Sequence, residues 1–244
     1  MKTYSGAPYA DATHSALQRR LLRNASFPPR NPQQDALKMG PVPMVPEVHL
    51  FLAEDSVLLW ARLESEAGTS LPAPYWATAW PGGQALARYV LDNPEIVVGR
   101  RVLDLGSGSG LVAIAAAMAG AAEVTANDTD GYAIAAIQAN ANANGVQIAC
   151  AIDDLTDGDG GDAEVILAGD CLYSAEVAAM MLPFLGRAMN RGATVLLGDP
   201  SRGYAVPGLL RTVTTYQTAP LGSGEDGQRD EVSVLTPVAV ALTA

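Results

Sequence analysis

Three glycines and an acid in one short stretch have the types and spacing of a ligand-binding turn. We call residues 104–110 the glycine turn; the residues that carry this prediction are Asp104, Gly106, Ser107, Gly108 and Gly110. Glycine lets the backbone approach a ligand closely, and the N–H groups that begin a following helix attract anionic or polar groups. A dinucleotide site would need the spacing GxGxxG, but position 111 is Leu. A carboxylate at position 104 would also repel a pyrophosphate, so the turn favours a ligand with a positive amino group and no phosphate.

A second acid follows at the distance where a nucleoside is held. Asp128 comes directly after Asn127 and lies 22 residues after Gly106, at the end of the next expected strand. Folds of this kind place there the acid that binds ribose hydroxyls, and a carboxylate can accept two O–H bonds at once. A solvated carboxylate at a strand end is the alternative. The predicted ligand is S-adenosylmethionine, which joins a nucleoside to an amino acid.

An acidic pair, Asp153 and Asp154, ends the third expected strand. One of the two carboxylates could accept a hydrogen bond from an adenine amino group, and we favour Asp153. A pair of acids that only forms a turn is the alternative.

The elements that must position these residues alternate regularly from residue 101 onward. Strands are expected at residues 102–105, 124–127, 146–152, 165–168 and 194–197. Helices are expected at residues 84–91, 111–119, 132–143 and 175–189. The extended runs 211–219 and 232–240, joined by a glycine-rich turn, indicate an antiparallel hairpin. The fold class is therefore α/β, with a Rossmann-like, mostly parallel seven-stranded sheet that a C-terminal hairpin completes.

The N-terminal part differs from this pattern. Residues 1–46 are expected to form an arm or leader, and residues 47–244 the main domain. A helix is expected at residues 13–24, and six prolines exclude a continuous helix or central strand over residues 27–46. That stretch is either a disordered leader or an ordered arm over the body. Residues 48–52 and 56–63 are expected to be two strands around a turn.

Charge and composition restrict the partners. The net charge is −11, although residues 1–46 are net basic, and this acidity disfavours nucleic acid. Cys150 and Cys171 form no CxxC, which favours a reducing compartment, and no apolar run is long enough to span a membrane. No spacing indicates a metal site. We expect a monomer in the bacterial cytoplasm, because the alanine-rich, lysine-poor composition is typical of GC-rich bacteria, or in the mitochondrial matrix if the source is eukaryotic.

Several motifs together carry a family resemblance. Residues 102–128 resemble motifs I and II of class I, seven-strand methyltransferases. The run from Trp80 to Gln84 (Trp-Pro-Gly-Gly-Gln), the motif Gly-Asp-x-x-Tyr from Gly169 to Tyr173, and Gly198-Asp199-Pro200 resemble the lysine methyltransferases that modify the electron transfer flavoprotein β subunit. The resemblance covers about residues 44–240.

The resemblance implies a protein substrate, a lysine side chain as methyl acceptor and S-adenosylmethionine as donor. It implies that Asp170 and Tyr173 meet the target lysine, and that Trp80 and Gly83 lie near the cofactor. An N-cap role is the alternative for Asp170, although Ser174 is better placed for it. Trp76 fits a core or a site position equally, and Arg202 is interpreted as a surface arginine rather than a substrate contact.

The predicted reaction is an in-line displacement from a sulfonium to an amine, for which the protein aligns the two groups and supplies a neutral amine. Other acceptors stay open, namely a ribosomal protein lysine or a small-molecule amine. A non-catalytic cofactor-binding scaffold is the alternative from another class, and the intact motifs argue against it. A dehydrogenase is disfavoured by the residue at position 111.

Overall fold

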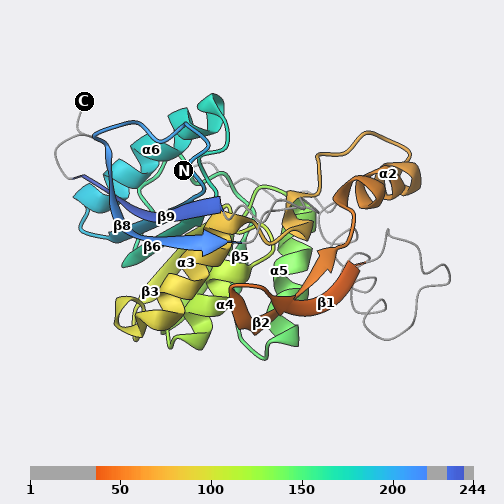
Figure 1. The fold of residues 1–244 in the computed structure, drawn as a ribbon, viewed down its shortest axis with the longest axis horizontal. Helices are drawn as coiled ribbons and strands as arrows, with labels where there is room; N and C mark the ends of the chain where they lie inside the picture. Colours follow the sequence, from red (N-terminus) through yellow and green to blue (C-terminus); the bar gives the residue numbers. More distant parts are fainter. Residues whose placement is uncertain (1–36, 219–229, 239–244) are drawn as a thin grey trace, which may run out of the picture.

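A twisted sheet forms the centre of the molecule. The structure is a computed structural model that describes residues 37–218 and 230–238. Within those residues the main sheet has seven strands in the order β5-β4-β3-β6-β7-β9-β8 (Figure 1). The strands are β3 (Arg101–Leu105), β4 (Glu123–Asn127), β5 (Ala149–Ala151), β6 (Val165–Gly169), β7 (Thr194–Asp199), β8 (Leu210–Thr218) and β9 (Asp230–Pro237). Strands β3 to β7 run parallel, and β9 pairs antiparallel with β7 and β8. The predicted fold class is confirmed; β5 begins later than expected.

Helices cover both faces of this sheet because its strands are apolar on both sides. Val102 and Val165 face the helices α3 (Pro81–Asp92), α4 (Leu111–Met118) and α5 (Gly131–Ala143). Their neighbours Leu103 and Ile166 face α6 (Ala175–Asn190), which lies on the other side (Figure 1). Because β3 to β7 run in the same direction, their carboxyl ends lie at the same edge of the sheet, between the two helical layers.

A two-stranded hairpin packs against the helical layer of α4 and α5. It consists of β1 (Leu37–Val42) and β2 (Val45–Ala53) (Figure 1). Val42 and Val45 are fully buried in the core. Residues 37–46 are therefore ordered over the body and continuous with it, whereas the predicted boundary had placed them in the arm. The expected helix at 13–24 and the turn before β9 lie outside the described residues.

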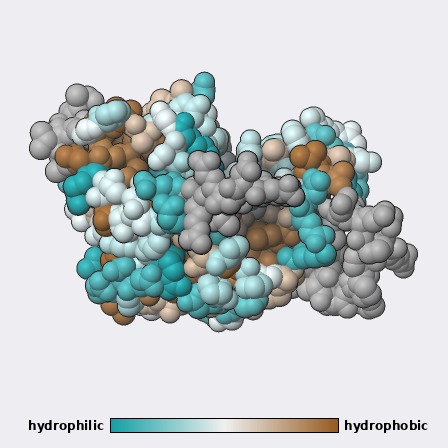
Figure 2. Space-filling view, viewed as in Figure 1, coloured by the Kyte–Doolittle hydropathy of each residue, from teal (hydrophilic) through white to brown (hydrophobic). Residues whose placement is uncertain are grey.

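The segment after β2 corrects one prediction. Residues 56–63 were expected as a strand, but Ser56–Ala67 form helix α2. The side chain of Asp55 accepts hydrogen bonds from the N–H groups of Val57 and Leu58, which makes it an N-cap rather than part of a turn. Leu59 and Leu63 lie four residues apart and are buried. Figure 2 shows apolar residues at the surface over α2, where Val57 and Leu58 are exposed.

Asn140 of α5 and Asn144, the C-cap residue of that helix, hold the hairpin in place. The Oδ1 atom of Asn140 accepts from the N–H of Phe51 at 2.8 Å, and its Nδ2 donates to the carbonyl of Ser109 at 2.7 Å. Asn144 accepts from the N–H of His49 at 2.9 Å and donates to the carbonyl of the same residue at 2.6 Å. The hairpin is thus tied through α5 to the glycine turn.

The start of α3 lies unusually close to the ends of β6 and β7. A Cβ atom on Gly198 would lie 1.9 Å from the carbonyl oxygen of Gly82, and one on Gly169 would lie 2.7 Å from the Cα of Gly83. Only glycine permits this approach. The Trp-Pro-Gly-Gly run therefore brings the first turn of α3 onto the sheet edge where ligands bind in such folds. Among the described residues, no helix is long and apolar enough to cross a membrane.

Candidate functional site

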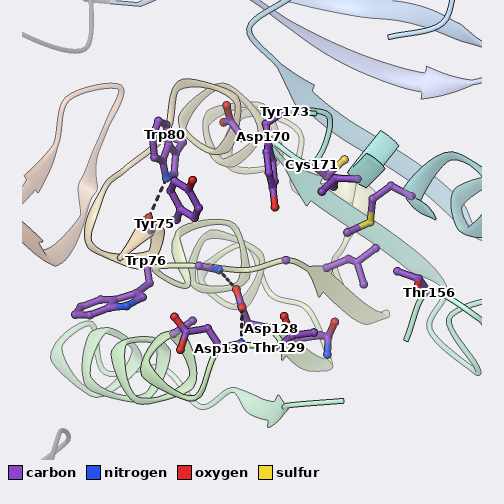
Figure 3. A pocket seen from close by; sticks show the side chains of 18 of the residues that line it. Tyr75, Trp76, Trp80, Asp128, Thr129, Asp130, Thr156, Asp170, Cys171 and Tyr173 are labelled. Atoms are coloured by element: carbon purple, nitrogen blue, oxygen red, sulfur yellow. Dashed lines mark hydrogen bonds between the residues drawn. The ribbon is translucent and has the colours of Figure 1, made fainter. Parts of the chain in front are cut away.

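A pocket of about 780 Å³ opens at the carboxyl edge of the sheet. One wall carries Asp128, Thr129 and Asp130, which follow β4 (Figure 3). Across the opening lie Tyr75, Trp80, Asp170 and Tyr173 (Figure 3). Val177, Met180 and Met181 of α6 contribute apolar surface. The pocket thus joins a polar half near the glycine turn to an aromatic half near α3.

The glycine turn has the backbone that its sequence predicts. Gly106, Gly108 and Gly110 have φ values of 65°, 55° and 86°, in the left-handed region that favours glycine. Gly106 and Gly108 line the pocket, so the backbone is exposed to a ligand there. Gly110 serves packing, because a Cβ at that position would lie 3.3 Å from the Cα of Ile137 in α5.

Asp104 is turned away from the pocket. Its Oδ2 accepts from the Ser107 hydroxyl at 2.5 Å and from the N–H of Ala113 at 3.0 Å. Its side chain is buried, and neither Asp104 nor Ser107 is among the pocket-lining residues. Within the described residues its Oδ1 has no hydrogen-bond partner. Burial raises the pKa of Asp104 to about 7 although both hydrogen bonds oppose this. Asp104 was predicted to contact the ligand directly. In the structure its side chain instead links the glycine turn to α4.

Asp128 directly follows β4, at the strand end where it was predicted to lie. Its two oxygens accept from the N–H groups of Gly108 at 2.9 Å and Asp130 at 3.0 Å, and it lines the pocket. Burial raises its pKa, while the backbone hydrogen bonds lower it. Asn127 also lines the pocket, and its Nδ2 donates to the carbonyls of Ala151 and Asp153. The ends of β4 and β5 are thereby joined under the polar half of the pocket.

Of the two acids after β5, the structure places Asp154 rather than the favoured Asp153 at the pocket. Asp153, the favoured member, is exposed and is not among the lining residues. Asp154 lines the pocket, and its Oδ1 accepts from the N–H and the hydroxyl of Thr156 at 2.9 and 2.6 Å. These hydrogen bonds lower the pKa of Asp154.

Asp170 lies at the junction of the two halves. It has a φ of 55°, which is rare for a residue other than glycine, and its N–H donates to the carbonyl of Gly198 at 2.8 Å. Its Oδ2 accepts from the N–H of Gly83 at 2.9 Å. Burial raises its pKa, whereas the Arg202 guanidinium and the backbone hydrogen bonds lower it. The N-cap of α6 is Ser174, whose Oγ accepts from Val177, so Asp170 does not have that role.

An aromatic wall surrounds Asp170. The rings of Tyr75 and Trp80 are 5.9 Å apart, and those of Tyr75 and Tyr173 are 6.1 Å apart. The indole N–H of Trp80 donates to the carbonyl of Tyr75 at 2.8 Å. Trp80 and Tyr173 were predicted, but Tyr75 was missed; its position in the same proline-flanked run was the available signal. Trp76 is buried and stacks on Tyr132, and it also lines the pocket, so it has both a core and a site position.

The interpretation of Arg202 as a surface arginine was wrong. Its Nη1 lies 2.5 Å from Oδ1 of Asp170, and its guanidinium carbon lies 5.5 Å from the centre of the Trp80 ring. It also lines the pocket. Gly83 does not line the pocket, and it contributes its N–H to Asp170 instead. Among the described residues no group of three or more His, Cys, Asp or Glu could hold a metal ion.

The chain is similar in sequence to known methyltransferases. A family profile described as ribosomal protein L11 methyltransferase (PrmA) matches residues 84–197. The electron transfer flavoprotein β subunit lysine methyltransferase of Danio rerio is 41% identical over 161 residues, which is 65% of this chain and 62% of the relative. Its Xenopus laevis counterpart is 43% identical over 162 residues, 66% of this chain and 65% of the relative. The chain therefore spans slightly less than two thirds of these relatives.

A solved structure of low sequence identity agrees with this chain in fold. A candidate RNA methyltransferase from Pyrococcus horikoshii matches with a TM-score of 0.50 and 16% identity, over 69% of this chain and 91% of that chain. Ribosomal protein L11 methylase from Lactobacillus delbrueckii subsp. bulgaricus matches with a TM-score of 0.47 and 23% identity, over 64% of this chain and 78% of that chain. At 16% identity the likeness to the Pyrococcus horikoshii protein concerns the fold alone.

Proposed function

The chain has the class I methyltransferase fold and resembles the electron transfer flavoprotein β subunit lysine methyltransferases, and from this premise we propose that it transfers methyl groups from S-adenosylmethionine to a lysine of that subunit. The observation that carries the proposal is the two-part pocket. A half suited to a nucleoside and an aromatic half around a buried carboxylate open into one cavity.

The polar half fits the donor. Gly106 and Gly108 present backbone without side chains, and Asp128 is held by two N–H groups with lone pairs left for ribose hydroxyls. Asp104 supports the turn from behind. Asp154 is better placed than Asp153 to meet the adenine side. When bound, S-adenosylmethionine supplies an activated methyl group.

The aromatic half fits the acceptor. The carboxylate of Asp170 would accept a hydrogen bond from the lysine amine and orient it, and the rings of Tyr75, Trp80 and Tyr173 would pack on the alkyl stem. A lysine has a pKa near 10.4 in water. Partial desolvation in this half of the pocket lowers that pKa, whereas the Asp170 carboxylate raises it. Asp170 would therefore accept the proton that the ammonium must lose before the neutral amine attacks the methyl group. The residues thus position and desolvate the amine.

Another protein lysine is the second candidate acceptor. The match of residues 84–197 to the ribosomal protein L11 methyltransferase profile favours it. We propose a bacterial cytoplasmic location, or the mitochondrial matrix in a eukaryote, and a monomer that uses neither nucleic acid nor a membrane. The net charge of −11 supports a partner with a basic, lysine-bearing surface.

The decisive experiment measures methyl transfer and cofactor binding on the same folded preparations. We expect the parental protein to methylate the electron transfer flavoprotein β subunit. Asp170→Asn should lower turnover by roughly 10²-fold or more, the scale for a lost positioning or proton-accepting group. Cofactor affinity should change little, because the Asp170 side chain faces the aromatic half.

Three outcomes separate the alternatives. Cofactor binding without transfer to any lysine would indicate a scaffold. Transfer to ribosomal protein L11 but not to the flavoprotein subunit would favour the second candidate. Parental activity in Asp170→Asn would show that the acceptor site lies elsewhere.

A further inference from the structure

Asp170, the carboxylate proposed to bind the acceptor amine, already forms an ion pair with a cationic side chain of the protein. Oδ1 of Asp170 is paired with Arg202 at 2.5 Å, and Oδ2 accepts from the N–H of Gly83 at 2.9 Å. The Gly83 N–H belongs to the first turn of α3, which is packed without free space against the ends of β6 and β7. Of these two partners, only the Arg202 side chain can leave without movement of the fold.

The Arg202 guanidinium also occupies the aromatic wall. It lies 5.5 Å from the centre of the Trp80 ring, within the range of a cation–π interaction. Trp80 is in turn 5.9 Å from Tyr75, which is 6.1 Å from Tyr173. A cation of the protein itself therefore has the same carboxylate and aromatic contacts that a substrate ammonium would use.

The surroundings of Arg202 permit its release. Its side chain is 28% exposed, so a path to solvent exists. The backbone on either side is in the left-handed region, with φ values of 60° at Ser201 and 88° at Gly203. Glycine adopts this conformation without strain, but for Ser201 it is uncommon and of the kind that clusters in ligand clamps and switch regions. Asp199 interacts electrostatically with Arg202 as well, so a second carboxylate is near the guanidinium when it leaves.

We propose that Arg202 is an internal competitor of the substrate lysine: it holds Asp170 until a substrate ammonium displaces it. This inference rests on the proposed function. Exchange of one cation for another keeps the buried carboxylate paired, whereas a buried carboxylate left alone would be strongly destabilising. A free alkylamine can compete with Arg202 for Asp170 only through its own charge and its short alkyl stem. A lysine on a docked protein also gains binding free energy from the rest of the protein–protein interface. Arg202 therefore selects for lysines that belong to a protein.

Replacement of the competitor tests this selectivity. For Arg202→Gln we expect the KM for the flavoprotein subunit to fall roughly tenfold, the scale of one charge-assisted hydrogen bond that no longer competes. The kcat should change less, and methylation of n-butylamine should rise relative to that of the protein. Arg211→Gln, which changes an exposed arginine of β8, is the matched control and should leave all three unchanged. A higher KM or a much lower kcat in Arg202→Gln would overturn the proposal, because Arg202 would then be a fixed positioning residue.

A binding measurement decides the same question without methyl transfer. n-Butylammonium, a mimic of the lysine side chain, is titrated into the protein at roughly pH 8.5, where an amine is still charged. Tryptophan fluorescence reports occupancy, and Trp80→Phe identifies the signal from this wall. Tighter binding to Arg202→Gln than to the parental protein supports the competitor role even if no methylated protein is found; equal or weaker binding overturns it. Arg202→Met, which keeps the apolar stem, replaces the Gln variant if thermal unfolding shows that the latter is misfolded.

Discussion

The hydrogen-bond partners of each carboxylate in this site determine where its side chain points. Asp128 and Asp104 both end up near the glycine turn, but two backbone N–H groups hold Asp128 at the pocket surface while Ser107 and Ala113 hold Asp104 inside. Asp170 is paired with Arg202 and faces the aromatic half. Under the proposed function, the same residue type would serve ligand binding at Asp128, loop support at Asp104 and acceptor positioning at Asp170.

Asp128→Ala should weaken S-adenosylhomocysteine binding by about 1.5–3 kcal/mol, the scale of hydrogen bonds to a charged group. The loss has two physical sources, namely the ribose hydroxyls and the tie to the Gly108 N–H. Isothermal titration calorimetry measures it, with Asp153→Ala as the control because Asp153 lies outside the pocket lining. Equal losses in both variants would mean that the ribose lies elsewhere.

Asp104 should make the stability of the ligand-free protein depend on pH. Burial raises its folded pKa to about 7, above the value in the unfolded chain. Its contribution to stability is therefore fully present at low pH and is lost as pH rises from about 4 through about 7. Denaturant unfolding from pH 5 to pH 8 should show that Asp104→Asn gains stability relative to the parental protein over this range. Parallel pH profiles for the two proteins would contradict the expected titration.

At the scale of elements, close packing between α3 and the sheet sets the geometry of the site. The first turn of α3 supplies the Gly83 N–H to Asp170 and lies against Gly198 of β7. On the far side of the glycine turn, Asn140 connects α5 to both the turn and β2. The site is therefore held by contacts between elements that are distant along the chain.

Gly198→Ala should destabilise the protein by about 1–3 kcal/mol, the usual cost of overpacking, because its Cβ would lie 1.9 Å from the Gly82 carbonyl oxygen. The shift of α3 should also lower methyl transfer by moving the Gly83 N–H away from Asp170. Chemical denaturation and activity are measured together. Gly40→Ala is the matched control, since no atom lies within 4 Å of its added Cβ, and it should be nearly neutral. A stable, fully active Gly198→Ala protein would show that the two backbones can separate freely.

At the scale of the whole molecule, the pocket and the N-terminal residues have separate roles. Among the described residues, those that line the pocket come from Pro72 onward. The hairpin of β1 and β2, by contrast, contributes Val42 and Val45 to the main core.

Two truncations should therefore behave differently. Removal of residues 1–36 should leave cofactor affinity unchanged. Removal of residues 1–46 deletes β1 and should lower the free energy of unfolding by about 3 kcal/mol or more, since each fully buried valine contributes about 1.5 kcal/mol or more. Thermal unfolding and calorimetry on both proteins check this. Lost cofactor affinity in the shorter deletion would place part of the site before residue 37.

The amino-acid sequence by itself determined the sheet, the glycine turn and the acids at the strand ends. These features depend on short-range patterns: alternating apolar runs, glycine at left-handed positions, and acids that directly follow strands. Parallel strands carry such acids to one edge, so Asp128 and Asp170 could be placed without coordinates. The strand predicted at 56–63 failed because the N-cap role of Asp55 was missed.

Only the tertiary structure decided which of these residues meet. Arg202 reaches Asp170 because β6 and β7 are neighbours in the sheet, and nothing in the local sequence around Arg202 indicates that pairing. The inward turn of Asp104 depends on the N–H of Ala113 in α4, and the need for glycine at 198 depends on α3. Contacts of this kind arise from packing between distant segments, where position in space rather than spacing along the chain determines the partner.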